Sequence, residues 1–213
     1  MLKIAAFLML TLPAQAETRY IVTTGGQVLG TLTQSESRLT SAFTNTPLGV
    51  FNGSFNGESR TTASGTQYRS DSQSSRKSRQ IEIRQSPDTR VTDVDISPES
   101  ERTALSNPAS VPANTLNPVA GFHRLLGQNT CPDAFKIYDG RRVIEITPTG
   151  TEINGPVTTC AFDYKVVQGQ GHLSPLYIKN ITLKLTFDTT LFATGPSLLT
   201  LRSGLFAVEF RRD

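Results

Sequence analysis

Two histidines are the side chains best suited to acid–base chemistry, and neither has the neighbours that a hydrolase requires. His123 and His172 are the only histidines in the chain. His123 falls at the edge of the apolar face of a predicted helix, which favours packing over a role as catalytic base. His172 follows Gly169-Gln170-Gly171, a turn-like run without an acidic neighbour. No Gly-x-Ser-x-Gly motif is present, so we expect no catalytic residues and no enzymatic activity.

Cys131 and Cys160 are the only cysteines, and they could form a disulfide, remain free or join the histidines in a zinc site. Because paired Cys-x-x-Cys or His-x-x-x-His spacings are lacking, we expect no metal and no other cofactor. In an exported chain, two cysteines most simply form one disulfide. Turns at Asp139-Gly140 and near Asn154 would bring both cysteines level with Pro148. We therefore predict that the intervening strand stops there and that the cysteines pair across its end.

The run Asp139-Gly140-Arg141-Arg142 is a candidate anion site, because two adjacent arginines can chelate a carboxylate or phosphate. On neighbouring strand positions Arg141 and Arg142 would point to opposite faces, which favours structural roles. A second basic group is interpreted as a solvated sheet face, with an anionic partner surface as the alternative. Its members are Arg69, Arg76, Lys77, Arg79 and Arg84.

The stretch 117–167 positions most of these residues and reads as a short helix followed by three strands. Asn117 suits the helix N-cap, Pro118 the first helical position and Gly127 the position after the last turn. The helix would dock its apolar face, which carries Val119, Phe122 and Leu126. The alternating run 135–146 around Asp-Gly predicts a hairpin, and a third strand carries Cys160, Phe162, Tyr164 and Val166.

The rest of the chain predicts more strands and few helices. We expect strands near residues 19–24, 27–35, 39–44 and 91–96, two long strands around Tyr68 and Ile81, and three strands after residue 177. Residues 48–51 are interpreted as a small apolar cluster. Residues 97–118, which are rich in proline, are interpreted as an interdomain linker or a long ordered crossing loop. We favour the loop, because the N-terminal strands look too poor in apolar residues to close a core alone.

The N-terminus predicts export. Lys3, the apolar run 4–12 and Ala14-Gln15-Ala16 form a secretory signal, so we expect cleavage after Ala16 and a periplasmic protein. No stretch is long enough to span a bilayer as a helix, so an integral membrane protein is not expected. The formal net charge of the whole chain is +3. Without a clustered basic face or stacking aromatics, nucleic acid is an unexpected partner.

Order and local pattern across nearly the whole mature chain resemble a family of exported bacterial proteins, domain of unknown function 3108. Tyr20 followed by Gly25-Gly26 and Gly30 is similar to the family's opening hairpin. Asn117-Pro118-Val119 through Leu125-Leu126 looks like its Asp-Pro-Leu-x-Ala-Leu helix, although Asn replaces Asp and Gly121 weakens the helix. Ile137-Tyr138-Asp139-Gly140-Arg141-Arg142 resembles its most recognisable hairpin. The resemblance implies a curved sheet similar to the periplasmic lipoprotein carriers, and it implies no reaction.

These observations predict a mainly β fold: a single curved antiparallel sheet, an open or half barrel, with one short helix in its concave face. Residues 17–213 would form one β-rich domain after a signal peptide at 1–16. We expect a non-catalytic carrier-like module that binds a lipid or other apolar ligand. The alternative is an envelope assembly factor that binds proteins through sheet edges. The expected ligand groove consists of Phe122, Leu126, Phe162, Tyr164, Leu183, Leu185, Phe206 and Val208.

Overall fold

The computed structural model describes residues 17–44, 46, 52–74, 77–172, 177–192 and 194–213. The signal segment 1–16 and the apolar cluster expected at 48–51 lie outside the described residues. The first half of the sheet comprises β1 (Thr18–Thr24), β2 (Gln27–Gln34), β3 (Arg38–Phe43), β4 (Gly53–Thr62), β5 (Gly65–Ser74), β6 (Ser78–Gln85) and β7 (Val91–Ser97). The second half comprises β8 (Thr115–Leu116), β9 (Phe135–Tyr138), β10 (Val143–Asn154), β11 (Val157–Gln168), β12 (Asn180–Asp188), β13 (Leu198–Ser203) and β14 (Phe206–Arg212).

All of these strands belong to one 14-stranded sheet, ordered β7-β6-β5-β4-β3-β2-β1-β14-β13-β12-β11-β10-β9-β8. The first and last strands pair at its centre, and each half is a meander that runs outward from there. The sheet stays open, since β7 and β8 are its two edges within the described residues. Pairing is antiparallel except between β8 and β9, which run parallel. The predicted mainly β class and single sheet are confirmed.

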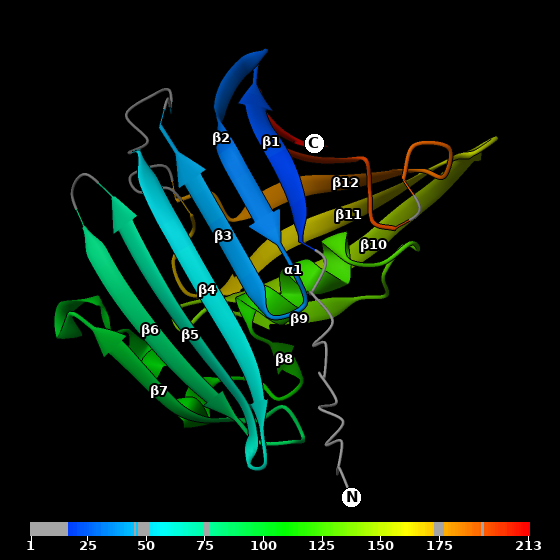
Figure 1. The fold of residues 1–213 in the computed structure, drawn as a ribbon. Helices are drawn as coiled ribbons and strands as arrows, with labels where there is room; N and C mark the ends of the chain where they lie inside the picture. Colours follow the sequence, from blue (N-terminus) through cyan, green and yellow to red (C-terminus); the bar gives the residue numbers. More distant parts are fainter. Residues whose placement is uncertain (1–16, 45, 47–51, 75–76, 173–176, 193) are drawn as a thin grey trace, which may run out of the picture.

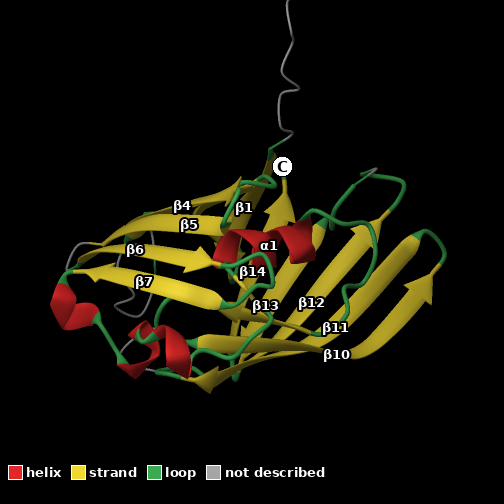
Figure 2. Ribbon diagram, turned by 90° about the horizontal axis from the view of Figure 1, so that it is seen from below, coloured by secondary structure: helices red, strands yellow, loops and turns green. Residues whose placement is uncertain are grey.

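The sheet is strongly curved, and α1 (Pro118–Leu126) lies in its concavity (Figure 1). Seen from below, α1 lies between the arm that contains β4–β7 and the arm that contains β10–β13 (Figure 2). One continuous core cluster joins the two arms, with contributions from Tyr20, Tyr68, Leu126, Phe162 and Leu185 among its fully buried side chains. Alternate residues of each strand point into this concave face, as the period of two requires.

The predicted helix is confirmed together with both of its caps. Asn117 Oδ1 accepts a hydrogen bond from the backbone N–H of Ala120 at 3.1 Å, and the Gly127 N–H donates to His123 O at 2.8 Å. Gly121, a poor helix former, is required by packing: a Cβ there would lie 2.5 Å from Ile137 Cδ1. The described helices include none with the length and apolarity needed to cross a membrane.

Residues 98–114 form the ordered crossing loop that connects the two edges of the sheet. The loop contains three short 3-10 helices, η1 (Glu99–Glu101), η2 (Ala104–Ser106) and η3 (Pro108–Ser110). The Tyr138 hydroxyl donates to Leu105 O in this loop. Gln85 Nε2 donates to Thr115 O at 2.7 Å where the loop ends. These contacts tie β6 and β9, which lie far apart in the sheet order, to the same connection.

The two central hairpins differ in detail from the sequence-based prediction. The β9–β10 connection is a four-residue loop, since Tyr138 pairs with Val143. The β10–β11 turn lies at Gly155-Pro156, because Asn154 pairs with Val157. Asp139 explains the longer first loop: its Oδ1 accepts the backbone N–H groups of Arg141 and Arg142 at 2.9 and 2.8 Å.

The predicted disulfide between Cys131 and Cys160 is confirmed, with a Cα–Cα distance of 5.7 Å. The predicted route was wrong, because β10 does not stop at Pro148 but continues to Asn154. Pro148 is accommodated at a shift in the β10–β11 register. It is β9 that is short, beginning at Phe135, so Cys131 reaches Cys160 over the face of β10, with its Sγ 3.5 Å from Thr151 Oγ1.

Two further details differ from the sequence-based prediction. The polar stretch after residue 52 contains an extra turn between Thr62 and Gly65, so it forms β4 and β5 rather than one long strand. Gly65 has a φ of +126°, and a Cβ there would lie 1.9 Å from Gln85 O. The first of the three strands expected after residue 177 begins at Asn180, and Tyr177 before it has a φ of +46°.

Candidate functional site

The burial of the side chains on the concave face changes from one end of the strands to the other. At one end α1 covers it: His123 Nδ1 lies 2.8 Å from Gln34 Nε2 at the end of β2, and Asn117 Nδ2 donates to Ser59 Oγ of β4 at 3.0 Å. We call the opposite end of this face the distal end. Its inward-facing apolar side chains are only partly buried, although they pack against the core. They are Phe43, Phe55, Tyr164, Leu201 and Val208, and strand register places half-buried Ile181 beside Tyr164.

The structure divides the eight residues of the expected groove between core and surface. Leu126, Phe162, Leu183 and Leu185 are at most 1% exposed, so they form the packed floor of the concave face. Phe122 is partly buried on the helix. The remaining residues, Tyr164, Val208 and Phe206, lie at the distal end, where Phe206 is 50% exposed.

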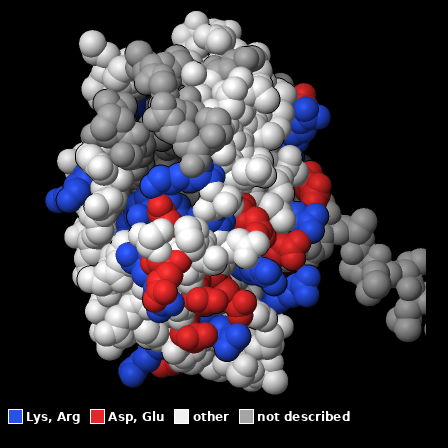
Figure 3. All heavy atoms as spheres, turned by 90° about the vertical axis from the view of Figure 1, so that its left-hand side faces the viewer, with Lys and Arg blue, Asp and Glu red and all other residues white. Residues whose placement is uncertain are grey.

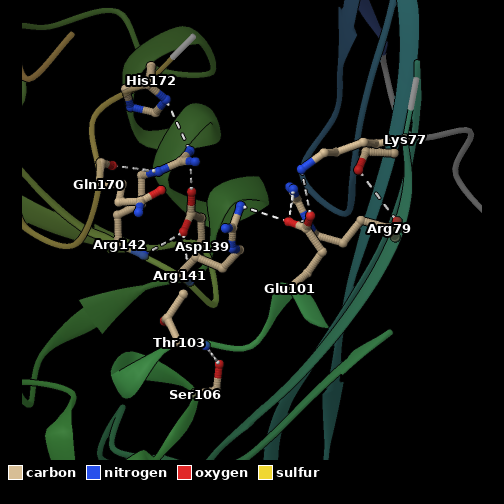
Figure 4. Close-up of polar contacts among 11 residues, drawn as sticks. Lys77, Arg79, Glu101, Thr103, Ser106, Asp139, Arg141, Arg142, Gln170 and His172 are labelled. Atoms are coloured by element: carbon tan, nitrogen blue, oxygen red, sulfur yellow. Dashed lines mark hydrogen bonds and ion pairs between the residues drawn. The ribbon is translucent and has the colours of Figure 1, made fainter. Parts of the chain in front are cut away.

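A network of charged side chains borders the distal end, where the crossing loop meets the β9–β10 loop (Figure 4). Glu101 is at its centre. It accepts a hydrogen bond from Lys77 Nζ at 2.9 Å and from Arg79 Nε at 3.1 Å, and it lies 3.2 Å from Arg141 Nη1. The hydrogen bond from Lys77, followed by those from Arg79, lowers the pKa of Glu101 to about 2.

Asp139 anchors the other half of this network. Its Oδ2 accepts from Arg142 Nη1 at 3.0 Å, and the same nitrogen lies 3.1 Å from His172 Nδ1. His172 Nε2 is in turn 2.7 Å from the Tyr164 hydroxyl. Burial, reinforced by Arg142, lowers the pKa of His172 to about 4, so the ring is neutral at neutral pH. Since Nδ1 faces an arginine N–H, Nε2 carries the proton and donates to Tyr164.

From the sequence, neither histidine is expected to have the neighbours of a catalytic base, and the structure gives the surroundings of each. His172 does have an acidic residue nearby, Asp139, but Arg142 lies between them and contacts both. This arrangement could not be predicted because Asp139 and His172 are far apart in the sequence. Neutral His172 is engaged on both nitrogens, which leaves no free base in this chain of contacts. His123 is half-buried, and its Nδ1 lies 2.8 Å from Gln34 Nε2.

The outer face near β4–β7 carries both signs of charge, interspersed (Figure 3). Arg84 pairs with Glu82 at 2.9 Å and with Asp93 at 3.4 Å, while Lys77 and Arg79 bind Glu101. The interpretation as a solvated sheet face fits Arg84, whose side chain is 58% exposed, but not Arg79, which is 22% exposed and shares Glu101 with Lys77 and Arg141. Arg76 lies outside the described residues.

Two larger hollows are lined mainly by polar side chains. One, of about 520 Å³, adjoins the start of α1 and includes Asn117, His123 and Thr115, whose buried Oγ1 has no hydrogen-bond partner among the described residues. Another, of about 670 Å³, is lined by residues of β3–β7 such as Ser54, Asp71 and Gln80. Within the described parts of the chain, no group of three His, Cys, Asp or Glu residues could hold a metal ion.

Comparison with known proteins adds no family assignment: no family model matches the chain, and no curated protein matches it.

Proposed function

We propose that the protein is a non-catalytic binding module of the bacterial envelope that holds an apolar ligand, such as a lipid acyl chain, at the distal end of its concave face. The observation that carries the proposal is the contrast along one face of one sheet. Leu183 and Leu199 are 1% exposed near the floor, whereas Phe206 is 50% exposed at the distal end. Partly exposed aromatic and aliphatic side chains gathered on an inward surface favour an apolar ligand.

The energetics support useful affinity for an acyl chain. Each buried methylene contributes about 0.8 kcal/mol, so a chain of about a dozen methylenes offsets the loss of translational and conformational freedom on binding. The filled floor limits the ligand to the distal end, since Phe162 and Leu185 are fully buried. A short or shallowly bound chain therefore fits better than one threaded along the whole concavity.

The cellular location is also part of the proposal. The secretory signal in the sequence and a disulfide between the only two cysteines fit an oxidising compartment such as the periplasm. The curved sheet with one short helix fits the resemblance to domain of unknown function 3108 and to the periplasmic lipoprotein carriers.

A fluorescent fatty acid tests the proposal on purified protein. Ile181→Gln places a polar group beside Tyr164 on the inner face, while Thr182→Gln makes the neighbouring change on the exposed outer face of the same strand. We expect Ile181→Gln to weaken probe binding by about tenfold and Thr182→Gln to leave it unchanged. Saturable binding that neither substitution alters, or no binding by the unmodified protein, would refute the proposal.

A second candidate function, protein binding by strand addition, rests on the far half of β10. Residues 147–154 pair with β11 on one side, and no described strand pairs with their other side, because β9 covers only Val143–Ile146. All eight are exposed, and Ile153 is 74% exposed. An unpaired strand edge offers backbone donors and acceptors to an extended partner segment.

Site-specific photocrosslinking in intact cells separates this second function from the first. A photoreactive residue at Ile153 should give discrete protein adducts, whereas one at Leu191, which is 65% exposed on a loop, should give none. Equal labelling from both positions, or none from Ile153, would remove the support for strand addition.

A further inference from the structure

The Arg141 side chain is mostly buried, and few of its N–H donors have an acceptor among the described residues. It is 17% exposed, and Nε is buried without a partner among the described residues. Among the described residues, the Arg141 side chain forms an ion pair with Glu101, in which Arg141 Nη1 lies 3.2 Å from Glu101 Oε2. A guanidinium carries five N–H donors, and buried donors are normally satisfied. Because Nε has no contact with solvent, the donors of Arg141 that remain open to a ligand are those of its terminal nitrogens, Nη1 and Nη2.

The surrounding carboxylates cannot supply that acceptor. Glu101 Oε1 binds Lys77, and its Oε2 is shared between Arg79 and Arg141. Asp139 is occupied by Arg142 and by backbone N–H groups. Four cationic side chains, Lys77, Arg79, Arg141 and Arg142, surround two carboxylates, which leaves two positive charges in excess.

A hollow of about 210 Å³ lies beside these arginines, large enough for several waters at about 30 Å³ each. Arg141 and Arg142 both line it, together with Thr103, Ala104, Leu105, Gly169 and Gln170. Arg142 donates from Nε to Gln170 O at 3.1 Å and from Nη1 to Asp139, so Nη2 is the nitrogen that it can offer to a ligand. The Thr103 hydroxyl oxygen accepts from the Leu105 N–H at 3.2 Å, so its own proton remains available to donate. Figure 4 shows Thr103 near Arg141.

We propose that this hollow binds an oxyanion of the phosphate class, held by Arg141 and Arg142 with a further hydrogen bond from Thr103. The adjacent arginines indicated an anion site, although on a strand their side chains would point to opposite faces. Arg141 and Arg142 instead lie in the loop between β9 and β10, so strand alternation does not separate them, and both line the hollow. An excess of two positive charges matches a phosphate better than a single carboxylate.

Arginine-detected NMR tests the site directly. We expect inorganic phosphate to shift the Arg141 Nε–Hε signal of the unmodified protein in a saturable manner. Arg141→Lys keeps the charge beside Glu101 but loses the planar fork, and it should weaken phosphate binding by about tenfold or more. Arg90→Lys is the matched control at a side chain that is 72% exposed, and it should leave binding unchanged.

Comparing three probes decides the source of the phosphate group: inorganic phosphate, dihexanoyl phosphatidic acid and dihexanoyl phosphatidylcholine. Both lipids are kept below their critical micelle concentrations. Tighter binding of phosphatidic acid than of inorganic phosphate identifies a lipid headgroup, and equal binding identifies a free phosphate; either supports the site. An unshifted Arg141 signal with all three probes, or equal losses in the two variants, would overturn it. The titration of unmodified protein decides the question even if Arg141→Lys fails to fold, and fatty-acid binding is scored separately.

Discussion

At the residue scale, features that depend on neighbours in the chain were predictable, and features that depend on distant partners were not. The caps at Asn117 and Gly127 and the two cysteines followed from local patterns. The Glu101 network did not, because Arg79 and Arg141 lie on opposite sides of it in sequence and meet it only through the fold. Glu101 lies in a proline-rich stretch two residues after Glu99, and the sequence does not indicate which of the two carboxylates meets the arginines.

Glu101 should contribute to stability in a pH-dependent way. Its pKa is depressed to about 2 from an ordinary value of 4.5, so its contribution is complete above about pH 4.5 and is lost as the pH falls toward 2. Glu101→Gln should lower the free energy of unfolding by roughly 1–3 kcal/mol at neutral pH, since Lys77 is two-thirds exposed and partly screened. Urea unfolding of both proteins between pH 7 and pH 2.5 checks this prediction. A difference that stays constant over this range would contradict it.

The Tyr138 hydroxyl should stabilise the contact between β9 and the crossing loop. It is fully buried and donates to Leu105 O, and it lies 3.1 Å from Gly140 O. Tyr138→Phe leaves these buried carbonyls without their donor and should cost about 1–2 kcal/mol. The measurement is thermal unfolding of Tyr138→Phe beside the unmodified protein. Equal melting temperatures of the two proteins would speak against a structural role for the Tyr138 hydroxyl.

At the element scale, the alternation of apolar and polar residues predicted the strands well, and the errors lay in the turns between them. The Asp-Gly pair suggested a two-residue hairpin, but Asp139 accepts two backbone N–H groups and so lengthens the loop to four residues. Gly140, with a φ of +93°, also lies close to the opposite arm, where a Cβ would meet Ile81 Cγ2 at 2.8 Å. A contact between β6 and this loop could not be predicted from either segment alone.

The disulfide should stabilise the connection between α1 and β9. Cys131 and Cys160 are separated by 29 residues, and closing such a loop contributes about 3–4 kcal/mol on chain-entropy grounds. Cys131→Ser with Cys160→Ser should therefore lower the melting temperature clearly, as should reduction of the unmodified protein. Calorimetry with and without reductant checks the prediction. An unchanged melting temperature in both experiments would show that the bridge constrains little.

At the scale of the whole molecule, the sequence indicated a curved β sheet with one helix but not the order of its strands. The chain ends pair at the centre of the sheet, Tyr20 opposite Arg212, and no local pattern encodes that pairing. The same limit applied to the groove. Alternation identified the inward residues but not how deeply each is buried: Leu183 and Val208 lie in one cross-strand row through Leu201, yet Leu183 is core and Val208 is half-buried.

The most direct test of ligand binding at the distal end uses the absence of tryptophan from the chain. A single tryptophan introduced by Phe55→Trp reports on the distal end, and Phe192→Trp, at a half-buried phenylalanine beside Arg212, reports on a site away from it. Titration with a brominated fatty acid should quench the first tryptophan saturably and leave the second unaffected. Equal quenching of both, or quenching of neither, would contradict binding at the distal end.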